Sequence, residues 1–576
     1  MGGLVAAEAA TEPVQAGDDD ASFADKSALL GSYAVGFQSR WVLDAARDYD
    51  TQLPDGAQYV GDQLRAPRPI LVNLWYPSEA EADATRMPHG GYFVIDDVEG
   101  SLVERSPRLP DFAKALSVYA RDVFVQQLFG AAEDTLETDD AARLADVLGT
   151  PTPCVRDALP APGRFAVVLY HAGYGSSFED NARLCELLAS HGYVVLGSAF
   201  PRADGSSLNI DGSEDSQADL DVLVRHAATL PFADVTRLAM AGHSGGAHVT
   251  LERAARPHTA LDACVVLDTT QDGNSVLDPR WESMVDACLA HVDEVDEPLL
   301  VATRPFGIFE LLDQMVHAER DYLSFRDLDH DDFISQGVQI AEMAARRVEA
   351  GAIGDEQDDR GRNAAEHLRV LRRNYSELCE AIVAFLDAHL QRAVESVASD
   401  ADASRADSEP SSAFEDVRAR WLATPLGGDR PHLEHVPVGV DGPDPYVLAS
   451  IADGPLPTPR QFRRVLDEHG AEVAIDVLRV ARAREPDGPL CDIVHDTALL
   501  YELAASGRDD DARAIGAYLH ASGSEAVSML VAFARVYGGQ ERYAEFRREC
   551  LRAALLAAPE DAEARTAWEA LEREEE

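Results

Sequence analysis

Short apolar runs alternate with helical periodicity between about residues 30 and 390 of this 576-residue chain. Several of the runs are apolar at every position, which is typical of parallel strands that are covered by helices on both faces. The runs predicted to form strands are 69–77, 164–173, 192–200, 237–244, 262–268 and 298–304. The alternation predicts an α/β fold whose central sheet is mostly parallel and flanked by crossover helices.

Helical periodicity also covers residues 100–160, before the first strong central strand. We expect this region to form a helical insertion or cap over the functional site, within a catalytic domain that spans residues 30–395. Residues 1–29 are expected to be a flexible N-terminal segment. Residues 396–456 begin with a charged, serine-rich stretch without apolar periodicity, which predicts an acidic linker followed by an extended segment.

Strand signals stop after about residue 457, and amphipathic helices follow one another to residue 576. Residues 499–519 and 529–550 share the pattern of helix, small-residue turn and helix, at an offset of about thirty residues. This pattern predicts a tetratricopeptide-like helical domain over residues 457–576, with an irregular helical bundle as the alternative. Because a short array buries little apolar surface by itself, we expect it to dock on the catalytic domain or on a second subunit, or to hold a protein partner.

The charge balance restricts the partners that the chain can have. Acidic residues outnumber basic ones by 102 to 50, and the formal net charge is −52. Such a surface repels phosphate backbones and anionic membranes, which argues against nucleic acid as a partner. Only Lys26 and Lys114 are lysines. A proteome adapted to high salt and a codon bias towards arginine both explain this balance, and both stay open.

Seven cysteines are scattered without a CxxC pair, which predicts neither a zinc cluster nor a disulfide framework. We therefore expect no metal, no cofactor and a reducing, cytoplasmic compartment. The first residues do not have the pattern of a signal peptide, and an exported protein whose leader is absent from this chain is the alternative. No apolar run approaches the length of a membrane span.

The first candidate for chemistry is the sequence GHSGG at residues 242–246, which follows a predicted strand and precedes a predicted helix. In this context GxSxG is typical of a nucleophile elbow, where the serine takes a strained conformation and the glycines let strand and helix approach. We predict that Ser244 is a nucleophile. The alternative is a small residue where two elements meet.

A serine nucleophile needs a base and a carboxylate that orients the base. His330 lies where an apolar, strand-like run ends, whereas His317 lies in a helical pattern and is expected at the surface. Asp268 ends the predicted strand after the Ser244 helix and is the predicted acid. Glu310 and Asp313 follow the next strand but lie in a helical stretch.

The tetrahedral intermediate of acyl transfer also needs two N–H donors for its oxyanion. The amide of Gly245, the residue after the nucleophile, is one expected donor. The glycine-rich loop at residues 170–177 is expected to supply the other from Gly173 or Tyr174. His171 is expected to be a structural residue of that loop.

These motifs together resemble those of the platelet-activating factor acetylhydrolase-like serine esterases, a branch of the α/β-hydrolases. The resemblance covers about residues 30–395 and rests on HAGYG, ASHGYVVLGSAF, GHSGG, VVLD and LDHDDF in that order, with VNLWYP as the early strand. It implies an α/β-hydrolase fold with Ser244, Asp268 and His330 at the positions of the family's triad. It also implies hydrolysis of short-acyl phospholipids or other small esters.

The sequence departs from that family in its oxyanion loop, which reads HAGYG where HGxG is usual, and in the insertion at residues 100–160. The supported level is therefore hydrolysis of carboxylic esters, with a small ester or lipid as substrate. A peptidase or amidase would use the same triad. A catalytically weak scaffold, in which the helical domain binds partners, is the alternative from another class.

Overall fold

The computed structural model describes residues 29–49, 66–200, 214–257, 261–269, 282–304, 310–390, 412–424, 431–440, 446–537 and 543–575, apart from residues 96, 97, 108, 177, 356, 359, 360, 423, 452, 453, 455 and 487. The expected N-terminal segment lies almost entirely outside the described residues. The charged, serine-rich start of the expected linker, up to residue 411, also lies outside them.

The described residues build a single ten-stranded sheet in the order β10-β9-β8-β7-β6-β4-β5-β2-β1-β3. The strands are β1 (Ala34–Tyr49), β2 (Ala66–Ser78), β3 (Cys154–Arg156), β4 (Phe165–His171), β5 (Tyr193–Gly197), β6 (Ala233–His243), β7 (Ala263–Leu267), β8 (Leu299–Thr303), β9 (Arg320–Ser324) and β10 (His432–Val436). All six predicted strands are among them.

The pairing directions define the fold class. The run from β5 through β4, β6, β7 and β8 to β9 is parallel throughout. Strand β2 is antiparallel to both β1 and β5, and β10 is antiparallel to β9. A mostly parallel sheet in this order, with its second strand reversed and helices on both faces, is an α/β-hydrolase fold, as expected.

Helices cover both faces of the sheet. Successive side chains of each central strand point to opposite faces, so they enter two different hydrophobic clusters. In β4, Val168 and Tyr170 belong to one cluster, whereas Val167 and Leu169 belong to the other. The first face is covered by α4 (Ala182–Ser190), α10 (Ala364–Leu390) and α11 (Ser412–Leu422). The second is covered by α5 (Glu214–Ala227), α6 (Gly245–Ala255), α7 (Glu282–Leu289) and α8 (Glu310–Asp313).

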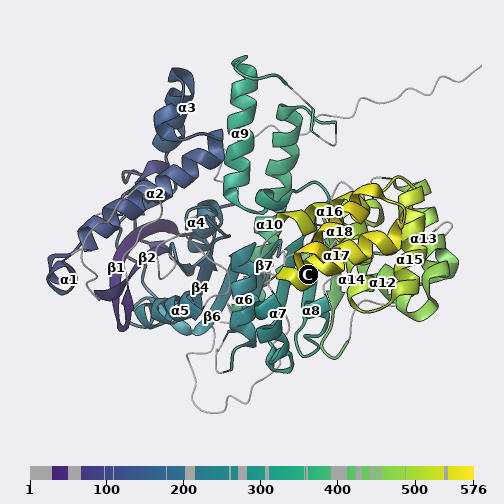
Figure 1. The fold of residues 1–576 in the computed structure, drawn as a ribbon. Coiled ribbons are helices and arrows are strands. Elements are labelled where there is room, and N and C mark those ends of the chain that lie inside the picture. The colour runs from purple at the N-terminus through teal and green to yellow at the C-terminus, as the bar shows by residue number, and fades with distance from the viewer. Residues whose placement is uncertain are drawn as a thin grey trace, which may run out of the picture.

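The expected insertion is helical and stands between β2 and β3. It contains α1 (Gly100–Arg105), α2 (Leu109–Phe129) and α3 (Thr138–Gly149). Phe93, Phe124 and Leu144 form a small core there, and Ile340 of α9 (Ser335–Glu349) packs against it. Figure 1 shows α2, α3 and α9 together on one side of the sheet. The insertion therefore packs on the helix that follows His330 in the chain.

Parts of the expected linker belong to the same unit as the central sheet, beyond the predicted boundary at residue 395. Residues 412–422 form α11, and residues 432–436 form β10, which pairs with β9. The sequence HLEHV of β10 has few apolar side chains, which is tolerated because an edge strand needs only one neighbour and can expose polar side chains. Strands β1 and β3, at the opposite end of the sheet, were also not predicted.

The C-terminal region is helical, as expected: α12 (Pro459–His469), α13 (Ala471–Arg484), α14 (Ile493–Ala505), α15 (Asp509–Ala521), α16 (Ala526–Val536), α17 (Ala544–Ala557) and α18 (Ala562–Glu575). The pairs α12–α13, α14–α15 and α16–α17 are in contact, and α13, α14, α15 and α16 also touch the next helix but one. Stacked helix pairs produce such contacts, and the tetratricopeptide assignment stays a prediction.

The helical domain docks on the β10 end of the sheet, at the opposite end from β1 and β2 (Figure 1). Arg460 of α12 is 4% exposed and forms ion pairs with Asp313 of α8 and, at 3.2 Å, with Glu434 of β10. Its guanidinium lies 4.1 Å from the ring centre of Tyr322 in β9. Docking on the catalytic domain was one of the outcomes expected for this domain.

Candidate active site

The backbone turns sharply at Ser244, between β6 and α6. Ser244 has φ 54° and ψ −118°, a conformation that a non-glycine residue rarely adopts. A Cβ on Gly242 would lie 2.1 Å from the carbonyl oxygen of Gly246, and one on Gly246 would lie 2.0 Å from that of His171. The GxSxG glycines are therefore required by close backbone packing, as predicted for an elbow.

The structure brings Ser244, His330 and Asp268 together in one hydrogen-bonded chain. His330 Nε2 lies 2.8 Å from Ser244 Oγ, and His330 Nδ1 lies 2.5 Å from Asp268 Oδ2. His330 begins the short helix after β9, and Asp268 follows β7 with a positive φ of 39°. The three side chains come from three strand ends that meet at the carboxyl edge of the parallel sheet.

An arginine that the sequence analysis did not single out contacts the carboxylate of Asp268. Arg304 Nε lies 3.2 Å from Oδ1 and 3.0 Å from Oδ2, and the backbone amide of Arg304 donates to Oδ1 at 3.2 Å. Burial opposes ionisation of Asp268, but the charge of Arg304 and the hydrogen bond from His330 outweigh it and lower its pKa to about 2. The Asp268 carboxylate is therefore ionised across the neutral range.

A second histidine supports the loop that carries His330. His243 Nε2–H donates to the carbonyl oxygen of His330 at 2.9 Å, and the two ring centres are 4.8 Å apart. Burial and the nearby His330 lower the pKa of His243 to about 3, so its ring is neutral. The only signal for it in the sequence was its position beside the serine in GxSxG.

Asp180 and Asn181 join the glycine-rich loop after β4 to the segment that follows His330. The carboxyl of Asp180 accepts hydrogen bonds from Tyr170 Oη and, at 3.4 Å, from the Gly173 amide. Its backbone carbonyl accepts from Ser335 Oγ, and Asn181 Oδ1 accepts from the Ser335 amide. Burial raises the pKa of Asp180 to about 7. These bonds fix the glycine-rich loop relative to the start of α9.

The candidate oxyanion donors lie beside the serine. Gly245 is the first residue of α6, so its amide has no partner within the helix. A Cβ on Gly173 would lie 3.3 Å from Ser244 Cβ, and the Gly173 amide points to Asp180. Tyr174 is 52% exposed. Burial raises the pKa of Tyr119 in α2, and the nearby phenol of Tyr174 adds to that effect.

The remaining candidates lie away from the serine. His171 is fully buried, stacks on Phe200 with ring centres 4.1 Å apart, and has a pKa lowered to about 4 by burial. His317 is exposed, in a turn rather than the helical pattern expected for it. Asp313 pairs with Arg460 of the helical domain. The side chain of Glu310 lies outside the described residues.

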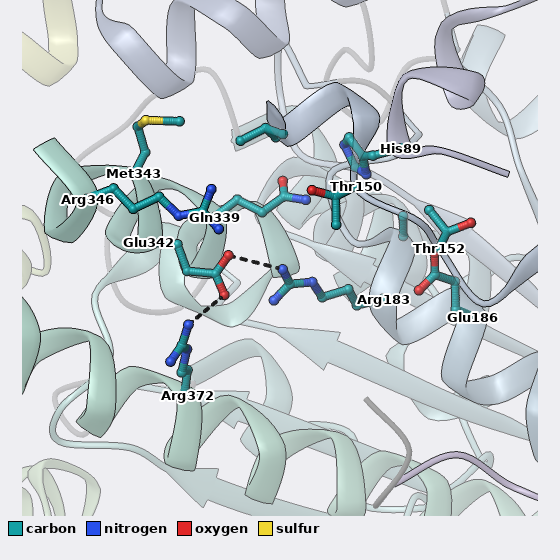
Figure 2. A pocket seen from close by; sticks show the side chains of 12 residues that line it. His89, Thr150, Thr152, Arg183, Glu186, Gln339, Glu342, Met343, Arg346 and Arg372 are labelled. Atoms are coloured by element: carbon teal, nitrogen blue, oxygen red, sulfur yellow. Dashed lines mark hydrogen bonds and ion pairs between the residues drawn. The ribbon is translucent and has the colours of Figure 1, made fainter. Parts of the chain in front are cut away.

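A separate cavity of about 100 Å³ lies between α3, α4, α9 and α10. In Figure 2, Arg183 and Arg372 point from α4 and α10 towards the carboxylate of Glu342, to which they donate at 3.4 and 3.2 Å. No residue of the Ser244, Asp268 and His330 chain is among the described side chains that line it. The cavity is therefore separate from the three hydrogen-bonded side chains.

The described residues also place carboxylate and imidazole atoms of Glu319, Asp321 and His435 within 4.8 Å of one another. Such donors could hold a metal ion. However, Arg418 Nη2 contacts Glu319 at 2.6 Å and Asp321 at 2.7 Å. An arginine charge therefore already balances these carboxylates at the β9–β10 edge.

No family model matches this chain, and no curated protein matches its sequence. Among solved structures, a ferulic acid esterase from Streptomyces cinnamoneus is 19% identical, with a TM-score of 0.38, over 64% of this chain and 94% of that chain. An acylaminoacyl peptidase from Pyrococcus horikoshii is 12% identical, with a TM-score of 0.29, over 41% of this chain and 39% of that one. The fold class rests on the strand order given above.

All seven cysteines are free thiols, and six of them are buried. Within the part of the chain that the structure describes, every helix is too short or too polar to span a bilayer.

Proposed function

We propose that this protein is a serine esterase that hydrolyses carboxylic esters through Ser244, His330 and Asp268 and an acyl-enzyme intermediate. The observation that carries the proposal is the continuous hydrogen-bonded chain from Ser244 Oγ through both ring nitrogens of His330 to Asp268. A serine hydroxyl is a weak nucleophile, and an imidazole oriented by a carboxylate is what activates it.

In the first half of the reaction, Ser244 Oγ attacks the ester carbonyl carbon while His330 Nε2 accepts the hydroxyl proton. Asp268 holds His330 in the tautomer with a proton on Nδ1 and stabilises the imidazolium that forms. The tetrahedral intermediate then collapses, the bond from carbon to the alcohol oxygen breaks, and His330 returns the proton to the leaving alcohol. Ser244 is left acylated.

In the second half, a water molecule gives a proton to His330 Nε2 as its oxygen attacks the acyl carbon. Collapse breaks the bond to Ser244 Oγ, which regains the proton, and the carboxylic acid leaves. In both halves, the carbonyl oxygen becomes negatively charged. We assign the backbone amides of Gly245 and Tyr174 as the hydrogen-bond donors that stabilise it. Tyr174 is preferred over Gly173 because the Gly173 amide is directed at Asp180.

For the substrate, we infer a small ester with a short acyl chain or a phospholipid-like ester. This inference is supported by the likeness of the motifs around Ser244, Asp268 and His330 to the platelet-activating factor acetylhydrolase-like esterases. Nucleic acid is not an expected substrate, because the chain carries a net charge of −52.

The proposal is tested with p-nitrophenyl esters from acetate to laurate and matched p-nitroanilides, using the wild type and S244A. Hydrolysis of the short esters by the wild type, lost in S244A, is the expected result. Faster cleavage of the anilides would assign a peptidase or amidase instead. A folded wild type that turns over neither series, even at high salt, would contradict the proposal.

A further inference from the structure

Arg304 directly follows β8, and its guanidinium and backbone amide both contact the carboxylate of Asp268. Its Nε lies within 3.2 Å of both carboxylate oxygens, and its own amide donates to Oδ1. The Asp268 side chain is 2% exposed and that of Arg304 is 20% exposed, so water screens this pair weakly. Oδ2 receives both Arg304 and His330 Nδ1.

This contact has an electrostatic consequence for the base. A carboxylate that faces only an imidazole favours the imidazolium, which cannot accept the proton of Ser244. A fixed positive charge that contacts the same carboxylate opposes that effect, because it offsets the negative electrostatic potential at the His330 ring. Arginine suits this role because its guanidinium stays charged at every pH of interest.

We propose that Arg304 is a positioning residue of the esterase site: it fixes the Asp268 carboxylate that orients His330, and its positive charge offsets the negative charge of that carboxylate at the His330 ring. The inference rests on the proposed function. Its consequence is an esterase whose activity extends further into the acidic range than a triad without this arginine would allow.

Other charged and titratable groups also surround His330, and each must be kept apart from the effect of Arg304. Burial lowers the pKa of His243 to about 3, so that ring adds no charge near neutrality. Burial raises the pKa of Asp332, which lies two residues after His330 in the same short helix. Asp329, Asp331 and His367 lie close enough to Asp332 to affect its pKa, and Asp331 also affects the pKa of Asp180.

The test is the dependence of kcat/KM on pH in the wild type, R304Q, R304M and R304K, with R420Q as the control. R304Q and R304M remove the charge, so the acidic limb of the profile should move to higher pH by about one unit. R304K keeps a charge and should keep the limb near its wild-type position. Arg420 pairs with Glu380 on the exposed side of α11, so R420Q should leave the profile unchanged.

The wild type and R304Q are also compared in a D332N background, where the difference between them should persist, because Asp332 is common to both. The rate of labelling by a fluorophosphonate probe against pH gives the same limb without an ester substrate. Thermal melting shows which variants are folded, and R304M takes the place of R304Q as the neutral variant if R304Q unfolds.

The inference would be overturned if the acidic limb of the kcat/KM profile stays in place or moves to lower pH in folded R304Q. It would also be overturned if the limb moves as far in R304K as in R304Q. That failure differs from failure of the proposed function. If S244A and D268N hydrolyse esters like the wild type, the function is wrong; if they are inactive and the R304Q limb stays in place, only the role of Arg304 is wrong.

Discussion

Backbone strain gathers around the site at the scale of single residues. Among the described non-glycine residues, only Asp157, Phe200, Ser244 and Asp268 have positive φ. Ser244 and Asp268 belong to the hydrogen-bonded chain with His330, and Phe200 stacks on His171 at the end of β4. Such conformations are retained only where the surrounding contacts hold them. The strain at Ser244 and Asp268 therefore accompanies the geometry that turns both side chains towards His330.

The first prediction separates Asp268 from Asp313. D268N should lower kcat by a factor on the order of 10³ to 10⁴, because an amide favours the wrong tautomer of His330. D313N should leave kcat near the wild-type value, since Asp313 pairs with Arg460 and not with the base. Steady-state kinetics on one ester measures kcat for both variants. A large loss of kcat in D313N with none in D268N would assign the role of the triad carboxylate to Asp313 in α8.

The sequence predicted that Ser244, His330 and Asp268 share one site, and the structure places the three side chains in hydrogen-bond contact. Each residue follows a recognisable apolar run, and the chain order of the three is informative. The sequence was not sufficient to predict Arg304, His243 or the Asp180 link. Arg304 and Asp268 are 36 residues apart, and only the parallel pairing of β7 with β8 brings them together. A lone arginine at a strand end carries no periodic signal, and its role depends on a partner that the fold selects.

At the scale of elements, the elbow depends on how closely α6 approaches β4 and β6. The carbonyl oxygens of His171 and Ala172 occupy the space where a side chain on Gly246 would begin. The same approach leaves the Gly245 amide at the start of α6, next to Ser244. Gly246 therefore allows α6 to pack closely against the sheet. The same close packing sets the position of the Gly245 amide, the candidate oxyanion donor.

The second prediction tests this packing. G246A should destabilise the fold by more than about 4 kcal/mol or prevent folding, because its Cβ would meet two backbone oxygens that cannot move independently of the sheet. Chemical denaturation followed by circular dichroism measures the effect. The matched control is G149A at the end of α3, where nothing lies within 4 Å and the change should stay within about 1 kcal/mol. Wild-type stability in G246A would contradict the packing argument.

The sequence predicted central elements better than peripheral ones. Strands β4 and β7 are buried along their whole length, so they appear as continuous apolar runs. Strands β1, β3 and β10 lie at or near the edges of the sheet, where polar side chains face water and the apolar signal is interrupted. The five residues of β10 also follow about forty residues after α10, so their pairing with β9 depends on tertiary contacts.

For the whole molecule, the main question is how the helical domain is held. Arg460 connects α12 to α8, β9 and β10 through two carboxylates and one aromatic ring. The contact is almost fully buried, with Arg460 4% exposed. A buried arginine that neutralises two carboxylates is costly to remove, because its partners are then left charged and unpaired. The docking of the two regions should therefore depend strongly on this residue.

The third prediction concerns that contact. R460M should lower stability by about 3 kcal/mol and expose the β10 end of the sheet, while ester hydrolysis by the remaining folded protein stays near the wild-type rate. Melting followed by calorimetry, with limited proteolysis between residues 437 and 458, measures the change. The control is R464A on the same helix, whose exposed pair with Glu468 should be worth less than about 1 kcal/mol. Equal melting of the two variants would show that Arg460 does not hold the domain.

The central claim is that Ser244 is activated by His330, and the most direct measurement is covalent labelling by a fluorophosphonate probe, mapped by mass spectrometry. Only an activated serine reacts quickly with such a probe. We predict a single phosphonylated site at Ser244 in the wild type, labelling slowed by several orders of magnitude in a His330→Ala variant, and no labelling at this site in S244A. An unlabelled Ser244 in folded wild-type protein, or labelling at the wild-type rate without His330, would contradict the account.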